Sequence, residues 1–140
     1  MNLWPPFLFA GIRVLDIAPD YHSARVALRR HWYNRNFVGT HFGGSLFAMT
    51  DPFWMLLVMQ QLGDDYIVWD RAARIDFIAP GKDTVFAEFQ LDTDIIETLR
   101  QATADGTKVL RWFEVDVTDA SGKIFAQVHK QLYVRRQRDG

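Results

Sequence analysis

One stretch of the chain, from Asn36 to Leu62, constrains the fold more than any other. It begins as a polar loop that contains Gly43 and Gly44, and it continues as a long apolar segment that ends before Gly63. A helix that is hydrophobic on nearly every face must be covered by the rest of the protein, because an exposed apolar cylinder would aggregate. The stretch therefore predicts one long buried helix at the core of the protein.

A single carboxylate, Asp51, interrupts this apolar segment and is followed directly by Pro52. Burying a carboxylate is costly unless another group pairs with it or the protein uses it. Proline inside a helix costs about 3 kcal/mol unless the helix kinks there, so the pair also fits an aspartate N-cap and the first residue of a restarted helix. Both interpretations stay open, and they are compatible, because a kink would also turn Asp51 outward.

Composition limits the classes of protein that the chain can belong to. Its 140 residues suffice for one core, so we expect a single domain over residues 1–140. A net charge of -1 gives no electrostatic reason to expect nucleic acid or an anionic membrane as partner. Cysteine is absent and the four histidines lack the spacing of metal ligands, so we expect neither a thiolate nucleophile nor a metal site.

Nothing in the sequence predicts export or a membrane span. The longest apolar run, Phe53 to Met59, is far shorter than the roughly 20 residues that a spanning helix needs. The first ten residues lack the positive region and the cleavage site of a signal peptide. We therefore expect a soluble, cytoplasmic protein.

Outside the long helix, alternation of apolar and polar residues predicts mainly strands. A short helix over Phe7–Ala10 is expected after two prolines. Asp94–Asp105 fits a short helix or a strand, and the strand is favoured because Asp105-Gly106 would then close a hairpin. The expected strands cover Ile12–Ile17, Ser23–Arg29, Tyr66–Ala79, Thr84–Leu91, Asp94–Asp105, Val109–Val117 and Lys123–Val134.

These elements predict an α+β fold in which about five or six antiparallel strands form a curved sheet around one long helix. An open sheet of this size leaves unpaired edges and a second face. Pairing of strands or stacking of sheets with a second copy is the usual remedy. We therefore expect a homodimer or a dimer of dimers.

The start of the stretch from Asn36 to Leu62 also carries a specific pattern, Asn36-x-x-Gly39-Thr40-His41-Phe42-Gly43-Gly44. Asp51 follows it in the helix, and a long strand ending at Ala79-Pro80-Gly81 comes later in the chain. This pattern resembles the hotdog-fold acyl-CoA thioesterases, in particular the phenylacetate-pathway type and an uncharacterised thioesterase-like branch of that superfamily. The resemblance runs from about Gly11 to Val134. It implies a hotdog fold, hydrolysis of a small-molecule acyl thioester, and no cofactor beyond the coenzyme A that is part of the substrate.

The chemistry of the loop agrees with this resemblance. The N–H groups of Gly43 and Gly44 lie where a helix begins, so they lack intrahelical partners and could hold an oxyanion. Asp51 follows Gly44 by seven residues, which is two helical turns, and so should emerge on the same side. By resemblance, Asp51 is the general base or nucleophile and acts across the dimer interface, while Asn36 orients the attacking water or the thioester. The glycines as a tight helix entry and Asn36 as a turn residue remain structural alternatives.

Two positions depart from the pattern of the relatives. Relatives commonly carry histidine directly before the two glycines, whereas here Phe42 stands there and His41 is one place earlier. Asp70 occupies a strand position where relatives often carry serine or threonine. It could pair with Arg71 at the surface, hold a water, or face Asp51 and raise the pKa of that carboxyl.

Aromatic residues supply the remaining candidates. Phe47, Trp54 and Trp69, with His41, Phe42 and Asp70, are our substrate-binding candidates, because a pocket for an apolar acyl or aryl group would be lined by such side chains. Packing in the core is the alternative role. Three functions remain open: a thioester hydrolase, an acyl- or acyl-CoA-binding protein without catalysis, and a purely structural oligomer.

Overall fold

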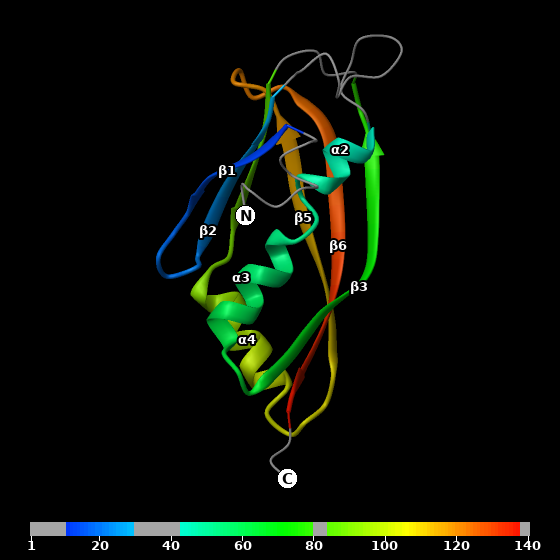
Figure 1. The fold of residues 1–140 in the computed structure, drawn as a ribbon. Coiled ribbons are helices and arrows are strands. Elements are labelled where there is room, and N and C mark those ends of the chain that lie inside the picture. The colour runs from blue at the N-terminus through cyan, green and yellow to red at the C-terminus, as the bar shows by residue number, and fades with distance from the viewer. Residues whose placement is uncertain (1–10, 30–42, 80–83, 138–140) are drawn as a thin grey trace.

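The computed structural model describes residues 11–29, 43–79 and 84–137 of the chain (Figure 1). The helix expected over Phe7–Ala10 lies outside these residues. The described elements are β1 (Ile12–Ile17), β2 (Ser23–Leu28), α2 (Gly43–Ala48), α3 (Phe53–Leu62), β3 (Tyr66–Phe77), β4 (Val85–Gln90), α4 (Thr93–Ala102), β5 (Val109–Thr118) and β6 (Ile124–Arg136). Among the helices in these ranges, none is long and apolar enough to cross a membrane.

The six described strands form one sheet in the order β1-β2-β4-β5-β6-β3, and every neighbouring pair is antiparallel. Strands β3, β5 and β6 are much longer than the others, and they twist along the length of the molecule beside α3 (Figure 1). The expected α+β architecture, a curved antiparallel sheet against a central helix, is confirmed. Strand β3 lies at one edge of the sheet, next to β6.

Helix α3 supplies the centre of the core. Its side chains Phe53, Leu57 and Val58 are fully buried. The ring of Phe53 lies 5.1 Å from that of Phe89 on β4, measured between centroids. Because burial of one such side chain contributes about 1.5–3 kcal/mol, this helix is a major source of the stability of the sheet that wraps it.

The expected central helix is present as two consecutive helices with a turn at residues 49–52. Helix α2 ends at Ala48, and α3 starts at Phe53, directly after Pro52. The restart at Asp51-Pro52 is therefore confirmed, and its cause is the proline, which cannot donate a hydrogen bond to the preceding turn. The role of Asp51 as N-cap is not confirmed, because no side chain caps the start of α3.

One expected strand is a helix. Most of the stretch Asp94–Asp105 belongs to α4 (Thr93–Ala102), in which Ile96 and Leu99 are both buried. Residues three apart share one face of a helix but point to opposite faces of a strand, so only a helix buries both. The Asp105-Gly106 turn, which favoured a strand, was outweighed by this packing, in which α4 lies beside the C-terminal half of α3 (Figure 1).

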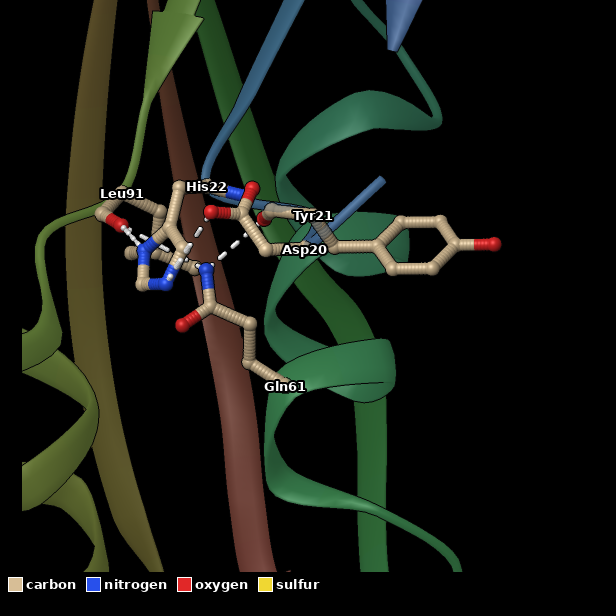
Figure 2. A network of polar contacts seen from close by, with 5 residues as sticks. All are labelled: Asp20, Tyr21, His22, Gln61 and Leu91. Carbon is tan, nitrogen blue, oxygen red and sulfur yellow. Dashed lines mark hydrogen bonds and ion pairs between the residues drawn. The ribbon is translucent and has the colours of Figure 1, made fainter. Parts of the chain in front are cut away.

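A set of polar contacts ties the end of α3 to the sheet (Figure 2). The side-chain amide of Gln61 donates to the carbonyl oxygen of Tyr21 at 2.7 Å and to that of Leu91 at 3.4 Å. The ring Nδ1 of His22 lies 2.9 Å from the same Leu91 oxygen, and its Nε2 lies 3.8 Å from a carboxylate oxygen of Asp20. These contacts hold the β1–β2 turn, the end of α3 and the approach to α4 together.

Candidate functional site

The turn between α2 and α3 places Asp51 over β6. The ammonium of Lys130, on β6, donates a hydrogen bond of 2.7 Å to Oδ1 of Asp51. The side chain of Lys130 is 2% exposed, whereas that of Asp51 is 50% exposed. The pair is therefore a half-exposed carboxylate above a buried cation.

Lys130 is buried because of its place in the alternation of β6. Its neighbours two residues away, Val128 and Leu132, are also buried, and in the sheet it lies opposite Ala73 of β3 and Phe113 of β5. A side chain at this position must point towards the helices. A lysine there is costly unless its charge is paired, and the carboxylates of Asp51 and Asp70 supply that pairing.

A second carboxylate, that of Asp70, reaches the same ammonium. Its Oδ2 lies 3.4 Å from Nζ of Lys130. Asp70 pairs with Leu132 in the sheet, and the register of β3 against β6 shifts between Asp70 and Ala72. The extra residue, Arg71, lets Asp70 and the inward-facing Ala73 lie on one face although they are three residues apart.

Burial raises the pKa of Asp70 above its ordinary value near 3.8. The charge and the hydrogen bond of Lys130 oppose this increase, and the charge of Asp51 adds to it. Asp70 thus lies near enough to Asp51 for their charges to interact, which is one of the arrangements expected from the sequence. The alternative pairing with Arg71 is not observed, since that guanidinium donates to the side chain of Gln131 at 3.0 Å.

Phe47, on α2, is the third neighbour of the buried ammonium. The centroid of its ring lies 5.7 Å from Nζ of Lys130, a distance at which a cation and an aromatic face attract each other. Three of the residues singled out in the sequence, Asp51, Asp70 and Phe47, therefore meet around Lys130. Sequence reasoning missed Lys130 itself, although a lone lysine in the buried register of an apolar strand was a usable signal.

Gly43 and Gly44 are the first two residues of α2, as expected for donors at a helix start. The expectation that two helical turns separate Gly44 from Asp51 is wrong, because α2 ends at Ala48 and Asp51 lies in the following turn. The remaining three candidates, Asn36, His41 and Phe42, lie outside the described residues.

The two tryptophan candidates are placed differently from Phe47. Trp54 is 5% exposed and stacks on Phe113 with a centroid distance of 4.9 Å, so it packs in the core. Trp69 is 54% exposed and packs on Tyr133 at 5.0 Å. Because it precedes Asp70 on β3, it lies on the opposite face of the sheet, and the single chain does not bring it to the site.

Comparison with solved structures identifies the fold. A protein of unknown function from Pseudomonas aeruginosa, described as a probable thioesterase, superposes with a TM-score of 0.80 at 21% identity, over 91% of this chain and 85% of that one. A thioesterase from Haemophilus influenzae gives 0.69 at 12% identity, over 99% and 87%. A mutant of the phenylacetic acid degradation protein PaaI from Thermus thermophilus gives 0.63 at 21% identity, over 92% and 97%. The hotdog fold expected from the loop and helix is confirmed.

Comparison of sequences identifies the family. No curated protein matches the chain. The profile of a family described as "Domain of unknown function (DUF4442)" matches residues 1–134, which is nearly the whole sequence. This chain therefore belongs to the DUF4442 family, and it has a hotdog fold.

Proposed function

We propose that this protein hydrolyses a small-molecule acyl thioester, such as an acyl-CoA, with Asp51 as general base or nucleophile. The observation that carries the proposal is the pair of Asp51 and Lys130, in which a half-exposed carboxylate is held by a buried ammonium. Asp70, whose pKa is raised by burial, contacts the same ammonium, and interacting titratable groups with a perturbed member are typical of active sites. The thioesterases among the structural neighbours favour the same class of reaction.

In the general-base form of the reaction, Asp51 takes a proton from water as the water oxygen bonds to the carbonyl carbon of the thioester. The resulting oxyanion accepts hydrogen bonds from the amides of Gly43 and Gly44, and Asn36 orients the water or the thioester. The carbon–sulfur bond then breaks, and the thiolate leaves and takes up the proton as a free thiol. In the nucleophilic form, the Asp51 carboxylate attacks the carbon, and the carbon–sulfur bond breaks with loss of the thiolate to leave an anhydride. Water then hydrolyses the anhydride, which restores the Asp51 carboxylate, releases the carboxylic acid and supplies the proton of the free thiol.

The substrate-binding part of the proposal uses the aromatic side chains near the carboxylate. Phe47 lies against the Lys130 ammonium and so borders the site. We assign His41 and Phe42 to the same acyl pocket on the strength of the sequence pattern. The proposed reaction requires no cofactor other than the coenzyme A moiety of the substrate. We place the protein in the cytoplasm, and its lack of cysteine fits that reducing compartment.

We further propose that the active form is a homodimer or a dimer of dimers, in which Asp51 faces the loop of a second copy. The position of β3 at the edge of the sheet supports this, because an unpaired edge is a ready site for another strand. Light scattering of the purified protein tests it. A mass of two or four chains is expected, and a monomer that hydrolyses thioesters would contradict it.

The experiment that tests the function is free-thiol release from short, long and aromatic acyl-CoAs. Asp51→Asn should lower kcat by about 10²–10⁴, the contribution typical of a general base, with the fold retained. Asp64→Asn is the matched control, because Asp64 is an exposed aspartate beyond the end of α3. Equal turnover by wild type and Asp51→Asn would refute the role of Asp51.

One observation favours a second candidate, an acyl- or acyl-CoA-binding protein without catalysis. One surface groove of about 450 Å³ is lined by residues that include His22 and Thr93. Another, of about 470 Å³, is lined by residues that include Arg25 and Gly122. Asp51 lines neither of these two grooves. A ligand in either groove would lie away from the carboxylate. Tight binding of an acyl-CoA with no release of thiol would support this candidate over the hydrolase.

A further inference from the structure

The ammonium of Lys130 has three neighbours among the described residues that can stabilise its charge. A lysine ammonium has three N–H donors and no acceptor. Within the described residues it meets the carboxylates of Asp51 at 2.7 Å and Asp70 at 3.4 Å, and it faces the ring of Phe47. Since its side chain is almost fully buried, it is placed to hold groups of the protein rather than to bind a substrate.

This arrangement distinguishes the two oxygens of Asp51. Oδ1 accepts the hydrogen bond of Lys130, whereas Oδ2 makes no hydrogen bond to any described residue. The turn between α2 and α3 leaves half of the Asp51 side chain exposed. Among the described residues, Oδ1 is therefore the oxygen that is held, and Oδ2 is the one open to accept a proton from water or to attack a carbonyl carbon.

A purely structural role explains the buried lysine less well. Replacing a buried ion pair by apolar side chains of similar volume is often neutral or stabilising by about 1–4 kcal/mol. The surroundings of Lys130 on β6 are apolar, since Val128 and Leu132 flank it on the same face. If the facing carboxylates were also replaced by neutral side chains, a methionine at position 130 would be expected to give at least the same stability. Stability alone therefore does not explain why a lysine is found here.

We propose that Lys130 is a positioning residue for the reaction: its ammonium fixes Oδ1 of Asp51 so that Oδ2 is directed at the thioester or its attacking water. This inference rests on the proposed function and adds to it a residue outside the loop and helix pattern. Asp70 has a supporting part, because it supplies a second carboxylate to the same ammonium. The geometry of Asp51, rather than the binding of substrate, then depends on Lys130.

Steady-state kinetics on the best acyl-CoA of the panel tests this role, together with thermal unfolding of each variant. Lys130→Met should lower kcat by about 10- to 100-fold and change KM by less than about threefold, because it removes an interaction that acts in the transition state. Lys130→Arg, which retains a cation, should recover part of kcat. Lys108→Met, at an exposed position, is the control and should retain wild-type kcat and KM.

A double variant separates positioning from neutralisation of charge. Lys130→Met leaves two facing carboxylates, and adding Asp70→Asn removes their repulsion. We expect Lys130→Met/Asp70→Asn to recover the unfolding temperature of the wild type, while its kcat stays at least about tenfold below that of Asp70→Asn alone.

Recovery of kcat in the double variant to the level of Asp70→Asn would overturn the inference, because Lys130 would then only balance charge. Unchanged kcat in Lys130→Met would overturn it as well, while the function of Asp51 would stand. Absence of thiol release by the wild type on every substrate would instead overturn the proposed function, and with it the role of Lys130.

Discussion

Lys130 and Asp51 are 79 positions apart in the sequence, yet the lysine Nζ lies 2.7 Å from the aspartate Oδ1. This contact joins the middle of the long strand β6 to the turn at which the central helix breaks. It gives the buried lysine a counter-charge and gives the turn a fixed point on the sheet. The same contact therefore serves the fold and defines the candidate site.

The pH dependence of stability should report on Asp70. Its pKa is raised in the folded protein, so the folded state holds the Asp70 proton to higher pH than the unfolded state does. Asp70 therefore lowers the free energy of unfolding as the pH rises towards and through its folded-state pKa. This destabilisation disappears below its ordinary pKa near 3.8, where Asp70 is protonated in both the folded and the unfolded state. We expect Asp70→Asn to unfold at a higher temperature than wild type at pH 7, with the difference shrinking towards pH 4.

Calorimetry between pH 4 and pH 7 measures this difference, with Asp64→Asn as the exposed control. A variant Asp70→Asn that is less stable than wild type at pH 7 would show that the bond to Lys130 outweighs the cost of burying the charge.

The central helix should be sensitive to loss of volume on its buried face. Leu57→Ala removes a fully buried side chain of α3, and we expect it to lower the free energy of unfolding by about 2–5 kcal/mol. Gln60→Ala, at an exposed position of the same helix, should change it by no more than about 0.5 kcal/mol. Urea titration of both variants makes the comparison, and similar midpoints would contradict the packing of α3.

The assignment of residues 93–102 as a helix predicts a pattern of proline sensitivity. Glu97→Pro should destabilise the protein by about 3 kcal/mol, because it removes an interior hydrogen bond of α4. Asp105→Pro lies beyond the end of α4 and should cost clearly less. If circular dichroism and unfolding data showed equal effects, the helix would not be formed in solution.

Substitution of Gln61 should show how much the polar contacts in Figure 2 contribute to the stability of the protein. Gln61→Ala removes the donor to the carbonyl oxygens of Tyr21 and Leu91, and we expect a loss of about 1–3 kcal/mol of stability. Because Gln61 lies at the C-terminal end of α3, away from Asp51, kcat for thioesters should be retained. A large loss of kcat with unchanged stability would instead connect these contacts to the site.

Local sequence signals predicted several parts of this structure correctly. The apolar stretch predicted the central helix, and Asp51-Pro52 predicted its restart, because proline acts through its own backbone. Six of the seven expected strands are present, and their ends lie within two residues of the expected ones. The strand expected over Asp94–Asp105 is wrong, because burial of both Ile96 and Leu99 requires a helix and outweighs the turn signal of Asp105-Gly106.

The candidate site was only partly predictable. The sequence pointed to Asp51 because a carboxylate in an apolar segment conflicts with burial. It did not indicate that Asp51 would leave the N-terminus of α3 uncapped and bond to a lysine on the last strand. That choice depends on the register of β6 between β3 and β5, which places Lys130 on the inner face.

By itself, the sequence determined the type and order of most elements, because hydrophobic periodicity and proline act over a few residues. Only the tertiary structure decided which charges meet. Strand order, the bulge at Arg71 and the break in the central helix bring Asp51, Asp70 and Lys130 together from three distant segments. The energy of such a buried cluster depends on distances and on the exclusion of water, which no local pattern encodes.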